Sequence, residues 1–339
     1  MKKRGESRRP TLKDVAALAG VSPITVSRAI RDPSLVSASL RSRIASSIQQ
    51  IDYTVDQNAS ALASSRTNVL AVMIPSITNA VFADVLRGAY DAVEDSHFQI
   101  QIANFRYSPE QEERMLRLFL SQKAAALILT GVDQTEAARA LLRECGRPVV
   151  QIMDAAATPI DMAVGFSHFD AGRALAQRML GLGYRRIGYI AARLDPRTLR
   201  RIAGYQDALA EIGVRDQTLI ASTPASSSMA LGRNLFRELH ARRPDIDAVM
   251  ANNDDLALGA LFECQRSGLR VPDDIGVAGF NDLEAAAAVY PSLTTVSTPR
   301  YEIGRRAVEM AVAAIEGAPI PAKSIDLGFS VRIRESTRR

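Results

Sequence analysis

From residue 69 onward, short apolar runs alternate along the chain with segments whose apolar residues recur at helical spacing. The apolar runs span residues 69–74, 100–103, 126–129, 149–153, 187–191, 248–251 and 275–280. The helical patterns between them include residues 82–94, 110–120, 171–182, 201–212 and 256–267. Such alternation is typical of parallel sheets that helices cover on both faces. One compact sheet does not need so many strands, so the pattern predicts an α/β fold with two doubly wound parallel-sheet subdomains.

The N-terminal part follows a different pattern, which predicts two short helices joined by a tight turn. One face of the first helix carries Leu12, Val15, Ala16 and Ala19. Thr11 is expected to cap this helix, with Asp14 completing a variant of the capping box. Gly20 can end it, because only glycine enters the left-handed region without a Cβ penalty.

The second helix is expected to begin with Ser22 as its cap and Pro23 at its first position, where a missing N–H costs nothing. Its inward face carries Val26, Ala29 and Ile30, and its outer face carries Pro23, Ile24, Thr25, Ser27, Arg28 and Arg31. This arrangement predicts a helix-turn-helix whose second helix enters a DNA major groove. The alternative is an ordinary amphipathic helix pair in a larger core. The AGVS turn, the two caps and the polar outer face together favour DNA binding.

Further along, Leu40, Ile44, Ile48 and Ile51 form the apolar stripe of a third helix. We therefore assign residues 1–55 to a three-helix DNA-binding domain, 56–66 to a linker or hinge, and 67–339 to an effector-binding and dimerisation domain. The linker is rich in Ala, Ser and Asn, which by itself is typical of a flexible segment.

Positive charge is concentrated in the N-terminal part of the chain. Residues 1–66 contain eleven Lys and Arg against five Asp and Glu, a net charge of +6. The whole chain carries +5, so the remaining residues carry about −1. This asymmetry is expected of a protein that binds nucleic acid through one small domain.

Several other functional classes are not indicated. The two cysteines, Cys145 and Cys264, are too few for a disulfide framework or a metal site, and the three histidines lack metal-ligand spacing. We find no GxSxG, HExxH, phosphate-loop or GxGxxG motif, so we expect neither catalysis nor a cofactor. No apolar run of about 18 residues and no secretory signal is present. We therefore expect a cytoplasmic protein without a membrane partner.

The segment AALAGVSPITVSRAIRD resembles the N-terminal signature of the lactose/galactose-repressor family of bacterial transcription regulators, and VRIREST at residues 331–337 resembles its closing signature. The resemblance covers nearly the whole chain. It implies an N-terminal DNA-binding domain and the fold of periplasmic sugar-binding proteins, with crossovers near residues 166, 295 and 327. No heptad repeat follows Thr337, so we expect a homodimer.

The resemblance also implies how such a dimer binds palindromic double-stranded operator DNA. In the family, the linker forms a hinge helix on operator DNA, and a leucine matching Leu62 enters the minor groove. Val55 and Ser60 stand where proline and arginine are frequent in the family. We expect DNA contacts from Thr11, Pro23, Ile24, Thr25, Ser27, Arg28, Asn58 and Leu62.

Open α/β sheets bind ligands at the carboxyl ends of their strands, so residues just after the apolar runs are candidate ligand contacts. The resemblance places effector contacts at Phe82, Asp154, Phe166, Arg201 and Asn253. For the two aromatic residues the alternative is core packing. For Arg201 it is a surface salt bridge, but its place directly before IAGY matches the family's ligand-binding arginine.

The nature of the effector is suggested by Asn281, which follows VAGF where sugar- and purine-binding members usually carry an aspartate. A neutral amide removes a charge that would repel an anion, while Arg106 and Arg201 could attract one. NDDLALGALFECQRSGLRVPDDIGVAGF is among the stretches that resemble gluconate-operon repressors. We therefore expect a sugar acid such as gluconate, 6-phosphogluconate or 2-ketogluconate.

Together these features predict a sequence-specific transcriptional repressor of a sugar-acid catabolic operon, controlled by its effector. Two alternatives belong to other classes: a sugar-binding module of a transport or sensing system, and a DNA-processing enzyme such as a recombinase. The absence of a signal peptide argues against the first. The absence of a nucleophile or an acidic triad argues against the second.

Overall fold

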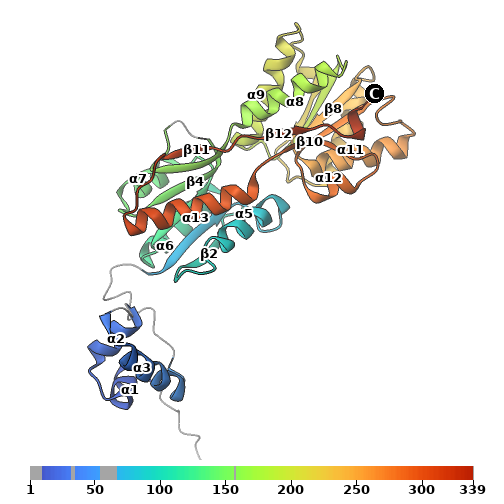
Figure 1. The fold of residues 1–339 in the computed structure, drawn as a ribbon. Helices are drawn as coiled ribbons and strands as arrows, with labels where there is room; N and C mark the ends of the chain where they lie inside the picture. The colour runs from blue at the N-terminus through green and yellow to red at the C-terminus, as the bar shows by residue number, and fades with distance from the viewer. Residues whose placement is uncertain (1–9, 32–34, 54–66, 156–157, 339) are drawn as a thin grey trace, which may run out of the picture. The chain divides into compact units, whose positions relative to one another are not determined.

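The computed structural model of the chain describes residues 10–31, 35–53, 67–155 and 158–338. These residues belong to two compact units, Met1–Thr67 and Asn68–Arg339, each of which is considered by itself (Figure 1). The expected hinge, with Asn58 and Leu62, lies outside the described residues.

The first unit contains the three expected helices, α1 (Leu12–Ala19), α2 (Pro23–Arg31) and α3 (Ala38–Gln50). The backbone N–H of Thr11 donates to the Asp14 carboxylate at 2.7 Å, which completes the capping box. Gly20 has a φ of 63° and ends α1, and Ser22 accepts a 3.2 Å hydrogen bond from the backbone of Thr25. The predicted helix-turn-helix is confirmed, and its core contains Val15, Ala16, Ala19, Val26, Ala29 and Ile44.

The second unit contains two six-stranded sheets. The strands of sheet A are β1 (Val69–Ile74), β2 (Gln99–Asn104), β3 (Ala126–Thr130), β4 (Val149–Asp154), β5 (Met162–Phe166) and β11 (Ser324–Asp326). Their spatial order is β11-β5-β4-β3-β1-β2, and all neighbours are parallel. The helices that follow the first three of these strands are α5 (Ala80–Asp91), α6 (Pro109–Ser121) and α7 (Glu136–Glu144).

Sheet B repeats this arrangement. Its strands are β6 (Ile187–Ala192), β7 (Ile220–Thr223), β8 (Ala248–Ala251), β9 (Gly276–Asn281), β10 (Thr294–Ser297) and β12 (Ser330–Arg332). The order is β12-β10-β9-β8-β6-β7, with only the β10–β12 pair antiparallel among the described strands. The remaining helical segments are α8 (His168–Gly181), α9 (Pro196–Ala210), η2 (Gln217–Leu219), α10 (Met229–Arg242), α11 (Asp254–Ser267), α12 (Glu284–Ala288), α13 (Arg300–Glu316) and η3 (Glu335–Thr337).

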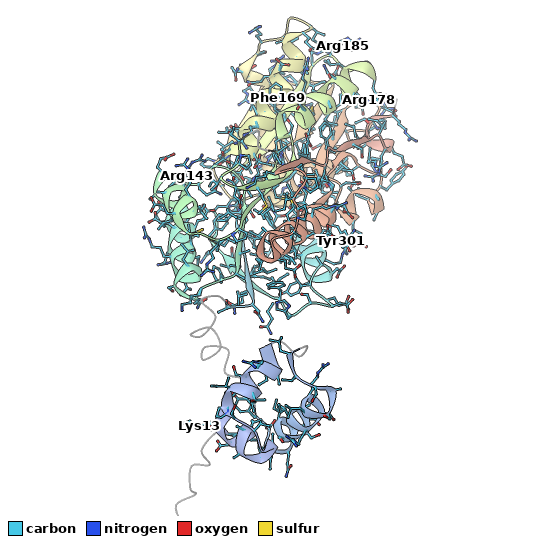
Figure 2. All side chains as sticks on the ribbon, turned by 60° about the vertical axis from the view of Figure 1, so that its left-hand side comes forward. Lys13, Arg143, Phe169, Arg178, Arg185 and Tyr301 are labelled. Atoms are coloured by element: carbon cyan, nitrogen blue, oxygen red, sulfur yellow. The ribbon has the colours of Figure 1, made fainter. Side chains whose placement is uncertain are left out.

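The chain passes between the two sheets three times. It leaves sheet A after Phe166 at the end of β5, returns between Ser297 and Arg300, and leaves again between Asp326 and Ser330. After the second passage α13 lies beside α5 (Figure 1). Tyr301 of α13, labelled in Figure 2, donates a 3.0 Å hydrogen bond to Asp91 at the end of α5. The predicted α/β class with two doubly wound subdomains is confirmed.

Glycines bring α8 and α9 into direct backbone contact beside the first passage. A Cβ atom on Gly172 of α8 would lie 2.4 Å from the carbonyl oxygen of Arg201 in α9. A Cβ atom on Gly204 of α9 would lie 2.0 Å from the carbonyl oxygen of Phe169 in α8. No side chain fits at either position, so the two glycines set the distance between the helices that carry His168 and Arg201.

Two negative observations apply to the described part of the chain. None of its helices is both long and apolar enough to cross a membrane. In the same ranges, no group of three or more His, Cys, Asp or Glu side chains is arranged to hold a metal ion.

Candidate functional site

A cavity of about 140 Å³ lies at the carboxyl ends of strands from both sheets, and we refer to it as the cleft. Its lining follows β1, β2 and β4 of sheet A and β6, β7, β8 and β9 of sheet B. The lining residues are Ser76, Thr78, Asn79, Val81, Phe82, Tyr107, Met153, Ala192, Arg193, Asp195, Arg197, Thr198, Arg201, Ser227, Asn252, Asn253, Asp255 and Asn281. The cleft is therefore at the edge where a doubly wound sheet binds its ligands.

Four of the predicted effector contacts line this cleft, namely Phe82, Arg201, Asn253 and Asn281. Asp154 and Phe166 instead line an adjacent cavity of about 360 Å³, which we call the side cavity. Phe166 is fully buried, with its ring centroid 4.3 Å from that of His168. It therefore packs in the core beneath the site, which is the alternative considered for it from sequence.

Arg106 differs from the sequence expectation, because it is exposed and is not among the lining residues of either cavity. The chain turns after β2 with Arg106 and Tyr107 both in the left-handed region, at φ values of 53° and 58°. This turn brings Tyr107, and not Arg106, into the lining of the cleft. The arginines that line the cleft come instead from residues 193–201.

Arg201 of α9 is 8 % exposed, and its guanidinium contacts three different elements. Its Nε donates to His168 Nδ1 at 3.1 Å, and its Nη1 donates to the carbonyl of Asn252 at 2.6 Å. Its guanidinium carbon lies 3.7 Å from the centroid of the Phe280 ring. Burial lowers the pKa of Arg201 to about 10, so the side chain remains charged near neutral pH. These contacts differ from the surface salt bridge considered as an alternative from sequence.

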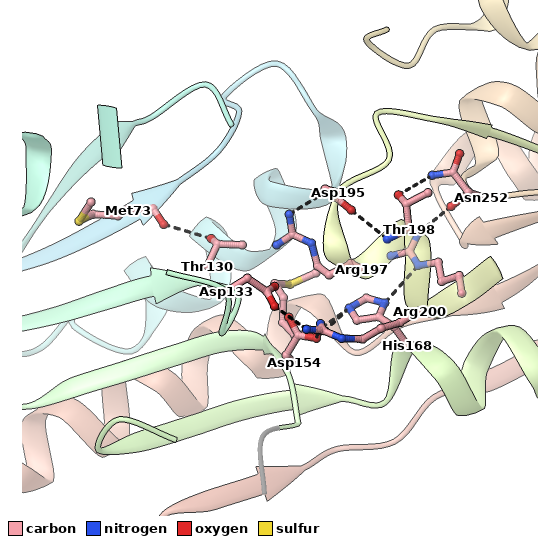
Figure 3. Close-up of polar contacts among 12 residues, drawn as sticks. Met73, Thr130, Asp133, Asp154, His168, Asp195, Arg197, Thr198, Arg200 and Asn252 are labelled. Carbon is pink, nitrogen blue, oxygen red and sulfur yellow. Dashed lines mark hydrogen bonds and ion pairs between the residues drawn. The ribbon is translucent and has the colours of Figure 1, made fainter. Parts of the chain in front are cut away.

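His168 joins the two sheets at the start of α8 (Figure 3). Its Nε2 lies 3.0 Å from the carbonyl of Met153, which can only accept, so Nε2 carries the proton. Its Nδ1 is then free to accept the hydrogen bond from Arg201. Burial, followed by the charge of Arg201, holds the pKa of His168 well below its ordinary value. A neutral imidazole thus connects the end of β4 in sheet A with α9 of the other subdomain.

Arg200 forms a second connection between the subdomains (Figure 3). Its Nη1 donates to Asp154 Oδ1 at 2.7 Å, and its Nη2 donates to Asp133 Oδ1 at 2.5 Å. The other carboxylate oxygen of Asp154 is buried without a hydrogen-bond partner. Burial raises the pKa of the Asp154 carboxyl to about 6, although Arg197 and Arg200 act in the opposite direction.

The raised pKa of Asp154 predicts a pH dependence of stability. An ordinary Asp has a pKa of 3.8, so the folded protein holds this proton more tightly than the unfolded chain. This stabilising contribution is present below about pH 4 and is lost as the pH rises through about 6, a change of up to about 3 kcal/mol in the free energy of unfolding.

Asp154→Asn removes the titrating group and keeps an oxygen that can accept from Arg200. The free energy of unfolding of this variant, measured by urea denaturation at several pH values, should therefore fall less steeply between about pH 4 and 7. Burial also raises the pKa of Asp254 to about 6, and this residue contributes to the pH dependence of stability in both proteins. Parallel profiles for the two proteins would show that Asp154 does not titrate in this range.

Backbone strain is concentrated around the cleft. Four lining residues other than glycine have a positive φ: Tyr107 at 58°, Met153 at 76°, Arg193 at 67° and Asn281 at 116°. Such conformations each cost on the order of 1–3 kcal/mol and are found preferentially at functional sites. Met153, Arg193 and Asn281 stand within one residue of the end of a strand, namely β4, β6 and β9.

Polar side chains in the cleft are held by neighbours that leave some of their donors and acceptors available. Asn253 caps α11, accepting from the backbone of Leu256 at 3.0 Å and donating to Ser227 at 2.7 Å. Arg197 donates from Nη2 to Asp195 at 3.0 Å. Sequence reasoning selected neither Arg193 nor Arg197, although both lie in ARLDPR directly after an apolar run, the position from which other candidates were chosen.

Comparisons with known proteins agree with this architecture. Residues 11–56 match the family model "Bacterial regulatory proteins, lacI family", and residues 176–337 match "Periplasmic binding protein-like domain". The HTH-type transcriptional regulator GntR of Pseudomonas aeruginosa is 41% identical over 329 residues, which cover 97% of this chain and 96% of that protein.

Two further similarities extend over nearly the whole chain. The HTH-type transcriptional regulator IdnR of Escherichia coli K12 is 35% identical over 325 residues, covering 95% of this chain and 97% of that protein. A solved LacI-family transcriptional regulator from Silicibacter pomeroyi has a TM-score of 0.88 at 36% identity, covering 97% of this chain and 100% of that one.

Proposed function

This chain belongs to the lacI family of bacterial regulatory proteins, and we propose that a small sugar acid, bound in the cleft, controls its binding to operator DNA. The protein is a DNA-binding transcriptional repressor and not an enzyme, as its relatives over nearly the full length are transcriptional regulators. The match of residues 11–56 also argues against a sugar-binding module without DNA regulation.

The observation that carries the proposal is the charge and hydrogen-bonding capacity of the cleft. Its described lining contains three arginines, Arg193, Arg197 and Arg201, against two aspartates, Asp195 and Asp255. Guanidinium groups bind carboxylates and phosphates through paired, charge-assisted hydrogen bonds. The remaining polar groups are mostly amides and hydroxyls, which suit the hydroxyl groups of a polyol.

The neutral amide of Asn281 supports an acidic ligand as well. It is 4 % exposed and lines the cleft at the end of β9, where a carboxylate would repel an anion at close range. Combined with the likeness of this sequence to gluconate-operon repressors, these features favour gluconate, 6-phosphogluconate or 2-ketogluconate as the effector.

The test is a calorimetric titration of the purified protein with those three acids and with glucose as a neutral hexose. We expect at least one acid to bind more tightly than glucose. Tighter binding of glucose would refute the proposal of an acidic effector, while leaving the assignment to the family unaffected.

Control of DNA binding by this ligand is supported by the position of the cleft between the two sheets. A ligand that contacts residues from both sheets stabilises the arrangement in which those contacts are made. It shifts the protein between states only by its difference in affinity for them. Release of operator DNA on binding the sugar acid would suit a repressor of a catabolic operon.

For DNA recognition, we propose that the outer face of α2 contacts base edges. Thr11, at the cap of α1, is proposed to contact the DNA backbone. Ile24 is 72 % exposed and Arg28 is exposed, whereas Val26 between them is fully buried. Pro23, Thr25 and Ser27 complete the proposed contacts in this unit, and Asn58 and Leu62 of the linker remain part of the proposal.

Replacing Arg28 by alanine should weaken binding to the operator by roughly 1–3 kcal/mol if the guanidinium pairs with a guanine. The measurement is fluorescence anisotropy on an operator fragment and on a random duplex of the same length. A selective loss on the operator assigns Arg28 to a base, whereas an equal loss on both duplexes would assign it to a phosphate.

We further propose that the repressor acts as a homodimer, which places two recognition helices on the two halves of a palindrome. Large apolar side chains remain exposed on α5, β2 and α11 of the second unit, namely Tyr90, Ile102 and Phe262. Their exposure supports the use of these elements in contact with a second copy.

A further inference from the structure

We propose that Arg193, held against the ring of Tyr107, binds the carboxylate of the effector and thereby selects acids over neutral sugars. This assignment rests on the proposed function, because it concerns the same ligand in the same cleft. It joins Arg193, which sequence reasoning did not select, to Tyr107, and the two residues come from opposite sides of the cleft, one after β6 and one after β2.

The charges around the cleft distinguish Arg193 from the other arginines there. Arg200 already pairs with Asp154 and Asp133, and Arg197 pairs with Asp195. Each of these arginines therefore already pairs with a carboxylate of the protein. An anionic ligand would have to compete with that carboxylate for the guanidinium.

The guanidinium of Arg201 is occupied by contacts with other groups than carboxylates. Two of its nitrogens donate to His168 and to the Asn252 carbonyl, and one face of the guanidinium is covered by Phe280. These contacts hold Arg201 against other residues of the sheet B subdomain, with only Nη2 left to contact a ligand.

In the part of the chain that the structure describes, the guanidinium of Arg193 has no hydrogen bond or ion pair. The guanidinium instead stacks on Tyr107, with its carbon 3.8 Å from the ring centroid. A guanidinium stacked on a ring keeps its N–H donors at its edge, where a carboxylate can accept two of them side by side. Arg193 is therefore the cleft arginine with both an uncompensated charge and an available edge.

The backbone holds Arg193 in this position before any ligand arrives. Its N–H donates to the carbonyls of Thr223 at 2.9 Å and Ala225 at 3.0 Å, which ties it to the end of β7. Arg193 and Tyr107 both have positive φ values, 67° and 58°, that most side chains avoid. Pre-organisation of this kind reduces the ordering cost of binding.

Because Tyr107 belongs to one subdomain and Arg193 to the other, the contact also spans the cleft. A carboxylate bound at the edge of Arg193 would lie beside both subdomains, and the hydroxyl groups of the same ligand could reach Asn253 and Asn281. The same contact would then select the acid and stabilise the arrangement in which the ligand contacts both subdomains.

The experiment compares Arg193→Ala with the wild-type protein by calorimetric titration with gluconate and with glucose. Loss of a charge-assisted pair should weaken gluconate binding about 10- to 100-fold and leave glucose binding unchanged. Tyr107→Ala should weaken gluconate binding less, and Tyr107→Phe should have little effect because it keeps the ring.

Arg87→Ala is the matched control. Arg87 of α5 also lies over a tyrosine, with its guanidinium carbon 5.6 Å from the ring centroid of Tyr301, but it does not line the cleft. Its replacement should not alter gluconate affinity. Thermal unfolding of each variant establishes that the fold is retained.

The outcomes separate this assignment from the proposed function. If the wild-type protein binds none of the acids, the proposed function fails and this assignment fails with it. If the wild-type protein binds gluconate and Arg193→Ala binds it equally well, only the assignment is overturned. If Arg193→Ala loses gluconate and glucose binding in equal measure, Arg193 does not select the carboxylate, and the assignment is again overturned.

Discussion

Replacing Arg201 by alanine should shift the response of operator binding to much higher effector concentrations while leaving operator binding itself intact. The substitution removes the donors to His168 Nδ1 and to the Asn252 carbonyl and uncovers the Phe280 ring. Each buried acceptor left without its donor costs about 1–3 kcal/mol. Because these contacts fix the sheet B side of the cleft and orient His168, which in turn contacts the Met153 carbonyl of sheet A, effector affinity should fall on the order of 100-fold, which is about 2.7 kcal/mol.

The measurement is the operator affinity of Arg201→Ala, by fluorescence anisotropy, over a concentration series of gluconate. Arg201→Lys is the second variant, since lysine keeps the charge but cannot bridge the same two acceptors in one plane. Arg178→Ala, at an exposed arginine of α8, serves as the control and should respond like the wild-type protein. A folded Arg201→Ala protein that responds at the wild-type gluconate concentration would show that Arg201 does not connect the cleft to DNA binding.

Replacing Gly172 by alanine should destabilise the second unit by about 1–3 kcal/mol, the usual cost of overpacking. The new Cβ would lie 2.4 Å from the carbonyl oxygen of Arg201, and backbone atoms cannot turn aside as a flexible side chain can. The helices α8 and α9 must therefore separate, which moves Arg201 away from His168. Gluconate affinity should fall together with stability.

Gly181 in the same helix is a matched control for Gly172. A Cβ there would meet no atom within 4 Å, so Gly181→Ala should leave stability unchanged or raise it by about 0.5–1 kcal/mol. Urea denaturation of the two variants measures the difference. Equal stabilities would show that the close packing of α8 on α9 does not require a glycine at position 172.

The first unit could be predicted from sequence because its signals are local. The capping box of Thr11 and Asp14, the left-handed Gly20 and the cap at Ser22 each depend on residues within four positions of one another. The strands could be predicted for a related reason. Buried parallel strands are apolar on both faces, so each forms a continuous run that needs no partner to be recognised.

The contacts of the cleft could be predicted only in part, because they depend on residues far apart in sequence. His168 contacts Met153, 15 residues before it, and Arg201, 33 residues after it, and Arg201 reaches Asn252, a further 51 residues on. In the sequence, His168 is one of three histidines without a recognisable role. Its importance follows from the first passage between the sheets, which places it between β4 and α9.

The direction in which side chains point could not be predicted from the sequence either. The position of a strand end predicted that residues after β2 and β6 approach the cleft, but not which of them point into it. Tyr107 and Arg193 line the cleft, whereas Arg106, which also has a positive φ, does not. Asp154 was likewise predicted at the right strand end, yet its carboxylate pairs with Arg200 at the side cavity.

Control of a separate DNA-binding unit by a sugar acid in the cleft is tested most directly by one titration. A palindromic operator fragment is saturated with the wild-type protein, and gluconate, 6-phosphogluconate, 2-ketogluconate or glucose is then added while the bound fraction is followed by anisotropy. We expect at least one acid to change operator affinity at concentrations where glucose has no effect. Operator affinity that stays constant across all four additions would contradict this control.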